Sequence, residues 1–128
     1  MINLRKNYLI TSVIYNFVYF AVPGQVEDLS LKPGSNNITV NWKKPILNSY
    51  CVAQYVIYWV KVLNGNNDSS IVSREENSFV IADLEACAEY EVSVRAVNEK
   101  GESSDAVTGS TTTETDGNYQ TYIILFCL

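Results

Sequence analysis

The amino-acid sequence predicts an all-β fold, an antiparallel β-sandwich built from seven short strands. Three observations carry this prediction. Apolar and polar residues alternate with a period of two in several short stretches, and turn-forming residues separate these stretches at intervals of roughly 8–12 residues. Tyr, Thr and Val recur throughout, and no stretch shows a helical period. With 128 residues, the chain is long enough for one domain and too short for two ordinary ones.

The first two strands are predicted around residues 26–31 and 38–43. The segment between them, 32–37, contains Pro, Gly and three polar residues in a row, which is typical of a turn. In 38–43, three apolar residues alternate with three polar ones, as expected for a strand with one buried face. Pro45 then ends this strand, because proline lacks the amide hydrogen that a ladder needs.

The third strand is predicted at residues 55–60, where large apolar or aromatic side chains occupy both faces. Residues 64–68, with the sequence NGNND, form a strong turn signal after it. A short fourth strand is expected at 71–72, where two β-branched residues stand between polar stretches.

The last three strands are predicted to begin near residues 79, 90 and 106. Residues 79–81 start the fifth, and Leu84 lies in the loop after it. Residues 90–97 alternate regularly between apolar and polar, which indicates another half-buried strand. A turn is expected at 98–101, and the Thr-rich segment 106–113 supplies the seventh strand.

Residues 1–22 differ from the rest of the chain. Arg5 and Lys6 precede the mostly apolar run 8–22, and a positive start followed by an apolar stretch is the outline of a secretory signal. Polar interruptions make this run a poor transmembrane helix, which needs about 20 apolar residues.

Residues 116–128 also lie outside the predicted globular part, which spans 23–115. They end in the apolar run Tyr122–Leu128, an aggregation liability if exposed. We expect this tail not to belong to the fold. A second hypothesis is that both ends, 1–22 and 116–128, are non-native translation of intron sequence in a gene fragment.

Charge and composition disfavour several classes of function. The formal net charge is −5, and the sequence has no cluster of Lys or Arg that could bind the phosphate backbone of a nucleic acid. The sequence contains no His, the commonest general base and metal ligand, and its three Cys residues have no zinc-type spacing. The acidic residues, which include Glu89 and Glu91, are interpreted as a solvated face. We therefore expect no catalytic, metal or cofactor site, no nucleic-acid partner and no small-molecule substrate.

Five segments, in this order along the chain, resemble the motifs of the fibronectin type III domain. The resemblance covers about residues 23–115 and implies a seven-stranded immunoglobulin-like β-sandwich. The segments are PGQVEDL at 23–29, ITVNWKKP at 38–45, YVIYW at 55–59, LEACAEYEVSVRAVN at 84–98 and GESS at 101–104.

The same resemblance points to Trp42, Leu84 and Tyr90 as residues of the structural core. Trp42 and Leu84 fall on inward positions, and a buried aromatic side chain contributes a large apolar area. Tyr90 stands at the start of the sixth strand, where β-sandwiches place a tyrosine whose hydroxyl bonds the backbone.

The resemblance implies a non-catalytic extracellular module, a spacer or protein-binding unit of a cell-surface receptor or adhesion protein. Its usual binding loops correspond to residues 46–53 and 98–105. Two alternatives stay open: a small stand-alone secreted protein, and an accessory module of a larger enzyme such as a receptor tyrosine phosphatase or kinase. In each case the expected partner is a protein, and membrane contact would come through a parent chain or residues 1–22.

Cys51 and Cys87 suggest a disulfide, because secreted domains favour paired cysteines. However, they are expected at opposite ends of the sandwich, and a strand of seven residues spans roughly 23 Å, whereas bridged Cα atoms lie within about 7 Å. Pairing with a neighbouring module and reduced thiols are the alternatives.

Two N-glycosylation sequons occur, at Asn37 and Asn67. Asn67 lies in the predicted turn after the third strand, and Asn37 lies just before the second. Exposed aromatic residues such as Tyr50, Tyr58 or Tyr119 are candidates for a partner surface.

Overall fold

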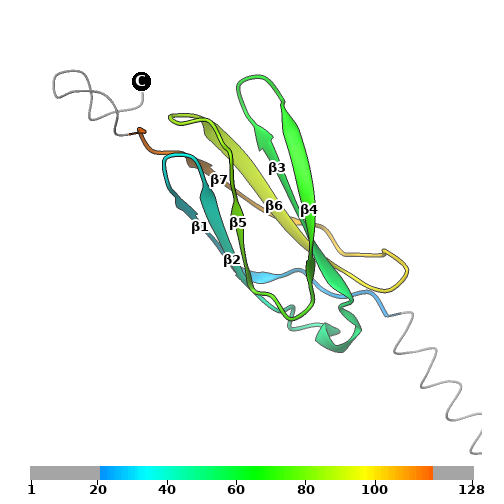
Figure 1. Cartoon of the computed structure of the whole chain (residues 1–128). Helices are drawn as coiled ribbons and strands as arrows, with labels where there is room; N and C mark the ends of the chain where they lie inside the picture. Colours follow the sequence, from blue (N-terminus) through cyan, green and yellow to red (C-terminus); the bar gives the residue numbers. More distant parts are fainter. Residues whose placement is uncertain (1–20, 117–128) are drawn as a thin grey trace, which may run out of the picture.

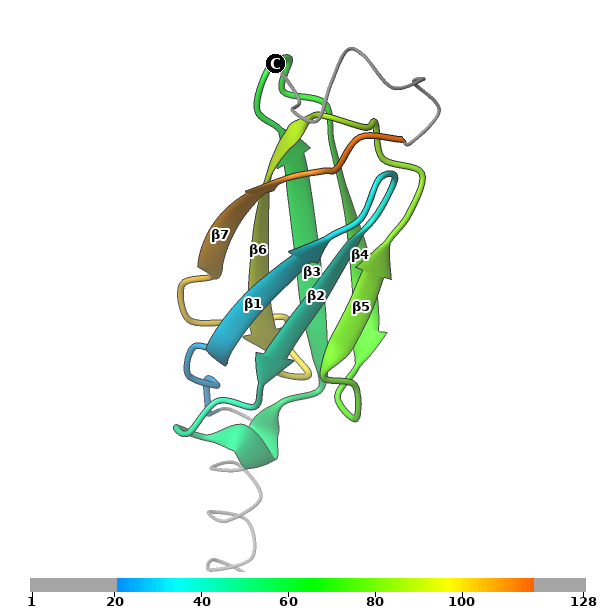
Figure 2. The ribbon, with the colours of Figure 1, turned by 90° about the vertical axis from the view of Figure 1, so that its left-hand side faces the viewer.

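The computed structural model describes residues 21–116, which form two antiparallel β-sheets packed face to face. The elements are β1 (Glu27–Pro33), β2 (Ile38–Lys43), a 3₁₀ turn η1 (Ser49–Cys51), β3 (Gln54–Lys61), β4 (Asn67–Ser73), β5 (Ser78–Ile81), β6 (Glu89–Val97) and β7 (Val107–Thr112). One sheet has the order β1-β2-β5 and the other β4-β3-β6-β7 (Figures 1 and 2). The structure thus confirms the predicted seven-stranded β-sandwich.

Strand β4 is longer than the sequence predicted. It begins at Asn67 and pairs residue by residue with β3, from Val60 opposite Asn67 to Gln54 opposite Ser73. The turn before it is tight, because the Gly65 amide donates to the Lys61 carbonyl at 2.9 Å. Gly65 has a φ of +73°, a value that glycine adopts without steric cost. The predicted turn therefore closes earlier, and Asn67 stands at the start of a strand.

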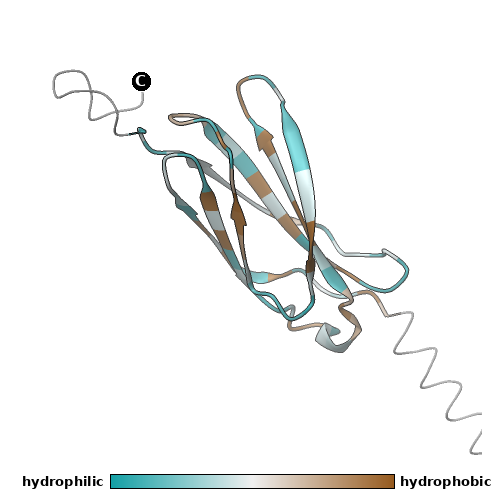
Figure 3. Ribbon diagram, viewed as in Figure 1, coloured by the Kyte–Doolittle hydropathy of each residue, from teal (hydrophilic) through white to brown (hydrophobic). Residues whose placement is uncertain are grey.

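The core lies between the sheets, where the inward residues of every strand meet. Hydropathy alternates along the strands, and this is visible as bands on β6 (Figure 3). Trp42, Leu84 and Tyr90 are all buried in this core, with 3%, 8% and 5% of their surfaces exposed. The ring of Trp42 packs on that of Tyr55 at a centroid distance of 5.3 Å and an interplanar angle of 60°.

Tyr90 fixes the corner where the chain crosses from β5 in one sheet to β6 in the other. Its hydroxyl accepts a hydrogen bond of 3.1 Å from the Glu85 amide, five residues upstream. The buried Thr113 closes the same corner, because its hydroxyl donates to the Glu85 carbonyl at 2.6 Å and accepts from the Ala88 amide at 3.0 Å. The corner is thus tied both to β6 and to the chain that leaves β7.

The two ends of the sandwich are formed by different loops. The N-terminal pole comprises residues 21–24, 46–53, 74–77 and 98–105, and the C-terminal pole comprises 34–37, 62–66, 83–88 and 113–116. The described chain enters at the first pole and leaves at the second (Figure 1). Within residues 21–116, no helix is long and apolar enough to cross a bilayer.

The two buried tyrosines Tyr90 and Tyr55 should differ in how much stability they lose when the hydroxyl is removed. Tyr90→Phe should lower the free energy of unfolding by about 1–2 kcal/mol, because the Glu85 amide loses its acceptor. Among the described residues, the Tyr55 hydroxyl makes no hydrogen bond of standard geometry, and the indole N–H of Trp42 is the polar group that interacts with it. Tyr55→Phe, the matched control, should leave stability within about 0.5 kcal/mol or raise it. Urea unfolding followed by Trp fluorescence measures both; an equal loss in the two variants would contradict this account.

Candidate functional site

The outward face of the four-stranded sheet carries a cluster of residues that suits a protein contact. Alternation along β3 turns Tyr55 and Ile57 into the core and leaves Val56 and Tyr58 outside. The antiparallel register places Arg95 opposite Val56 and Ser93 opposite Tyr58 on β6. On β4, Ser69 lies opposite Tyr58. Residues of β3, β4 and β6 that are far apart in the sequence therefore lie side by side on this face.

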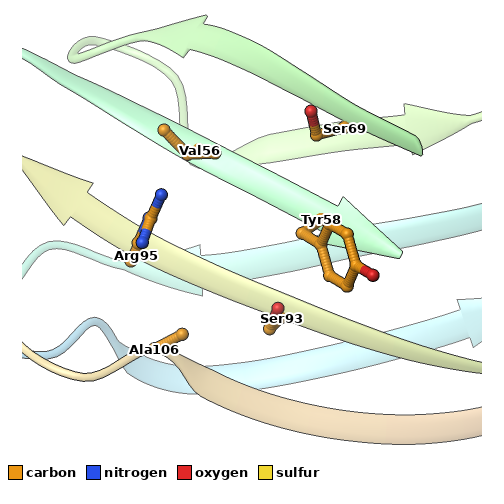
Figure 4. Close-up of a pocket in the computed structure, with 6 residues that line it drawn as sticks. All are labelled: Val56, Tyr58, Ser69, Ser93, Arg95 and Ala106. Carbon is orange, nitrogen blue, oxygen red and sulfur yellow. The ribbon is translucent and has the colours of Figure 1, made fainter. Parts of the chain in front are cut away.

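A shallow hollow of about 290 Å³ opens on this face (Figure 4). Tyr58 and Arg95 are its large members, and both are exposed. The smaller side chains around them leave room for a partner's side chain: Val56, Ser69, Ser93 and Ala106. We refer to these six residues as the Tyr58–Arg95 face.

The Tyr58–Arg95 face offers recognition groups rather than an arrangement for acid–base chemistry. It supplies a phenol, a guanidinium, two hydroxyls and apolar carbon. Tyr and Arg are enriched at protein interfaces and at the positions that dominate binding energy. In residues 21–116, no group of three Cys, Asp or Glu side chains is placed to hold a metal ion.

The acidic residues that the sequence placed on a solvated face are exposed. Glu89 and Glu91 alternate with the buried Tyr90 and Val92 along β6. Glu85 is exposed as well, and its carboxylate pairs with the ammonium of Lys61.

The N-terminal pole holds the incoming chain by three hydrogen bonds. The Gly24 amide donates to the Leu47 carbonyl at 2.9 Å, and the Asn48 side-chain amide donates to the Val22 carbonyl at 2.8 Å. The buried Asn98 donates to the Ala21 carbonyl at 3.0 Å. Both loops that the family resemblance pointed to, 46–53 and 98–105, therefore lie beside the point where the chain enters.

Asn98 also organises the second of these loops. Its side-chain oxygen accepts hydrogen bonds from the Lys100 amide at 3.0 Å and the Glu102 amide at 2.9 Å. Gly101 has a φ of +78°, which glycine allows at low cost. The loop is therefore built as a specific turn around one buried amide side chain.

Exposed apolar side chains gather on the first loop. Ile46 and Leu47 expose 84% and 66% of their surfaces, and Tyr50 exposes 45%. An apolar group of this kind marks a surface suited to contact with another protein or domain. Of the three aromatic residues predicted as partner candidates, Tyr50 and Tyr58 are thus exposed, and Tyr119 lies outside the described residues.

The two sequons lie in different settings. Asn37 is exposed in the turn between β1 and β2. Asn67 is exposed at the start of β4, and its side chain donates to the Gly65 carbonyl at 3.0 Å. Asn67 and Ser69 are two residues apart and so lie on the same side of β4, which places Asn67 next to the Tyr58–Arg95 face.

Cys51 and Cys87 are not bonded to each other, so the structure does not contain the bridge that the sequence suggested as one of three possibilities. Cys51 is a buried free thiol in η1 at the N-terminal pole, and its sulfur donates to the Asn48 carbonyl at 3.0 Å. Cys87 is disulfide-bonded and lies in the corner at the C-terminal pole. Strand β3, eight residues and therefore about 26 Å long, separates the two poles, which exceeds the reach of a disulfide.

Sequence reasoning missed Arg95 and its small neighbours. The alternation of β6 indicated that Arg95 is outward, but the pairing of β6 with β3 is a contact between segments some 40 residues apart. Nothing local in the sequence specifies which residue of β3 lies opposite Arg95.

The model of the fibronectin type III domain matches residues 24–124, so the chain belongs to this family. The solved fibronectin type III domain of the human collagen α-1(XX) chain is similar, with a TM-score of 0.66, 21% identity, and coverage of 80% of this chain and 95% of that one.

Two multi-domain structures are also similar. A two-domain fibronectin type III segment of chicken tenascin has a TM-score of 0.65 and 22% identity, with coverage of 73% of this chain and 51% of that one. The FN1–FN3 domains of chicken CNTN1 have a TM-score of 0.65 and 23% identity, with coverage of 73% and 33%. At these identities the likeness shows a shared fold.

The Cys51 thiol should be unreactive in the folded protein. Burial raises its pKa, and the thiolate is the form that alkylating reagents attack. We expect iodoacetamide at pH 8 to label Cys51 at least about tenfold faster in urea than in buffer, because unfolding restores the ordinary pKa of about 8.5. Peptide mass spectrometry of timed samples measures this. Equal rates in the two solvents would show that η1 does not bury the thiol.

Proposed function

We propose that this chain is a non-catalytic extracellular module, a spacer or protein-binding unit of a cell-surface receptor or adhesion protein. One observation carries the proposal: the described chain enters at one pole and leaves at the other, as a unit in a linear series of modules would. The similar domains of chicken tenascin and chicken CNTN1 occur in such multi-domain segments.

The N-terminal pole supports the role of a spacer. The three hydrogen bonds to residues 21–24 fix the direction in which the chain enters, so a preceding domain would be held at a defined angle. Ile46 and Leu47 provide apolar surface for such a contact, since they stand beside the entering chain.

The Tyr58–Arg95 face supports the role of a binding unit. Its central residues Tyr58, Ser69 and Ser93 lie on neighbouring strands of the four-stranded sheet and not in the loops of either pole, so they remain accessible when domains precede and follow. A protein partner would place a side chain in the hollow, with a carboxylate facing Arg95, because Arg binds carboxylates through two parallel hydrogen bonds.

Extracellular location can be tested on cells that express the protein from its own gene. A membrane-impermeant biotin reagent should label the chain or its parent, and a peptide N-glycosidase should lower its mass. The expected glycans are on Asn67 and Asn37, which are both exposed. Recovery of the chain only from the unlabelled cytosolic fraction, with a mass that the glycosidase leaves unchanged, would contradict the proposal.

Partner binding can be tested with beads that carry the purified chain and are added to intact cells. Tyr58→Ala and Arg95→Ala should each weaken binding about thirtyfold, the effect of losing a central interface residue. Val80→Ala, at an exposed position on β5 of the other sheet, is the matched control and should retain binding. Prior treatment of the cells with protease should abolish binding. If the two face variants bind as well as the unmodified chain, the Tyr58–Arg95 face is not the docking surface.

A further inference from the structure

The glycosylation sequon at Asn67 overlaps the surface that the proposed function assigns to a partner. Its third residue, Ser69, is one of the six residues of the Tyr58–Arg95 face and lies opposite Tyr58 in the ladder between β3 and β4 (Figure 4). Asn67 and Ser69 are both exposed. The residues that a glycosylating enzyme reads and the residues that a partner would contact therefore have Ser69 in common.

The strand register places Asn67 close to Tyr58 on the same face of the sheet. Asn67 lies opposite Val60 on β3, and Val60 and Tyr58 are two residues apart, so all three share the outward side. Diagonal neighbours of this kind in an antiparallel pair are roughly 7–8 Å apart, which is within reach of an aromatic or long side chain. A group attached to the Asn67 side chain therefore stands next to the Tyr58 ring.

The Asn67 side chain is placed so that the folded domain can carry a sugar on it. Its nitrogen donates a hydrogen bond of 3.0 Å to the Gly65 carbonyl. An N-linked sugar replaces one of the two hydrogens on this nitrogen, and the other can still make this bond. Asn67 is the first residue of β4, which is an edge strand of the four-stranded sheet. The position therefore has open space around it for a bulky group.

We propose that an N-linked glycan on Asn67 covers the Tyr58–Arg95 face and closes it to a protein partner. The inference rests on the proposed function, which supplies both the partner and the extracellular location. A branched N-glycan is bulky. Tyr58 adjoins the attachment point, and Arg95, four residues along the strands and two strands across, is roughly 16 Å from it. A glycan of several sugars extends over both residues.

The chemistry of the face suits a sugar as well as a partner. A sugar ring has apolar C–H groups on its faces and hydroxyl groups at its edge. The exposed ring of Tyr58 offers apolar surface to the first, and the hydroxyls of Ser69 and Ser93 offer hydrogen bonds to the second. The glycan thus competes for the same groups that a partner would contact. The fraction of chains that lack it sets how many can bind.

The second sequon provides a matched control within the same chain. Asn37 lies in the turn between β1 and β2, and its sequon residue Thr39 pairs with Lys32 and Val80. These residues belong to the three-stranded sheet, on the other side of the sandwich. A glycan on Asn37 therefore leaves the Tyr58–Arg95 face open.

Cover of the face is tested by tyrosine nitration, which needs no partner. The full chain, Asn67→Gln and Asn37→Gln are secreted from cultured animal cells behind an added leader peptide, and glycopeptide masses give the occupancy of each sequon. Tyr58 and Tyr50 expose 41% and 45% of their surfaces and lie on one tryptic peptide, 44–61, so Tyr50 is the internal standard. Tetranitromethane should nitrate Tyr58 severalfold more slowly in the Asn67-glycosylated chain than in Asn67→Gln, with Tyr50 unchanged. Equal Tyr58 rates, or no glycan on Asn67, would overturn the proposal.

Closure to a partner is tested with the same proteins on beads that are added to intact cells. Asn67→Gln should bind about thirtyfold more tightly than the glycosylated chain, the effect expected when a central interface residue becomes available. Asn37→Gln should bind as weakly as the glycosylated chain. Equal binding by Asn67→Gln and the glycosylated chain would overturn the proposal. If neither binds while Tyr58 is protected from nitration, the docking function fails and the cover is still supported.

Discussion

The corner between β5 and β6 is the constraint on which the rest of the structure depends. There the chain leaves one sheet and joins the other. Its backbone N–H and C=O groups at this point have no partner in a β-ladder and need other hydrogen bonds. The Tyr90 hydroxyl accepts a hydrogen bond from the Glu85 amide. The Thr113 hydroxyl donates to the Glu85 carbonyl and accepts from the Ala88 amide. Because Tyr90 belongs to β6 and Thr113 follows β7, these bonds also fix where the four-stranded sheet ends.

The N-terminal pole solves a similar problem with amide side chains. The carbonyls of residues 21 and 22 lie before the first strand and have no ladder partner, and Asn98 and Asn48 donate to them. Asn98 uses its oxygen for the turn that follows β6, so one buried side chain joins the entering chain to that turn. The direction of the chain at this pole is therefore a property of the folded domain, as the role of a spacer requires.

The sequence predicted the fold because the information for it is local. Period-two alternation marked β2 and β6, and the corner segment around Leu84 and Tyr90 is a motif of adjacent residues. The start of β4 was misplaced, since Asn67 has turn-forming character and is strand only because β3 pairs with it. Only part of the Tyr58–Arg95 face could be predicted from the sequence. Tyr58 was predicted to point outward, but which residues of β6 lie beside it depends on the register between two distant segments. The different states of Cys51, a free thiol, and Cys87, which is disulfide-bonded, were beyond sequence reasoning, because nothing in the residues around either cysteine distinguishes the two states.

The edges of the sheets bear on which surface is open to a partner. A free strand edge invites pairing with another chain, and proteins protect such edges by shortness, bulges, polar residues or cover. β1 carries a register shift between Glu27 and Ser30 and packs beside β7, β5 has four residues, and β4 begins with four polar residues. Strand addition at an edge is thus disfavoured around the sandwich. A partner that approaches from the side meets a sheet face, where Tyr58 and Arg95 stand above small neighbours, and this is why recognition through side chains is the mode that the geometry favours.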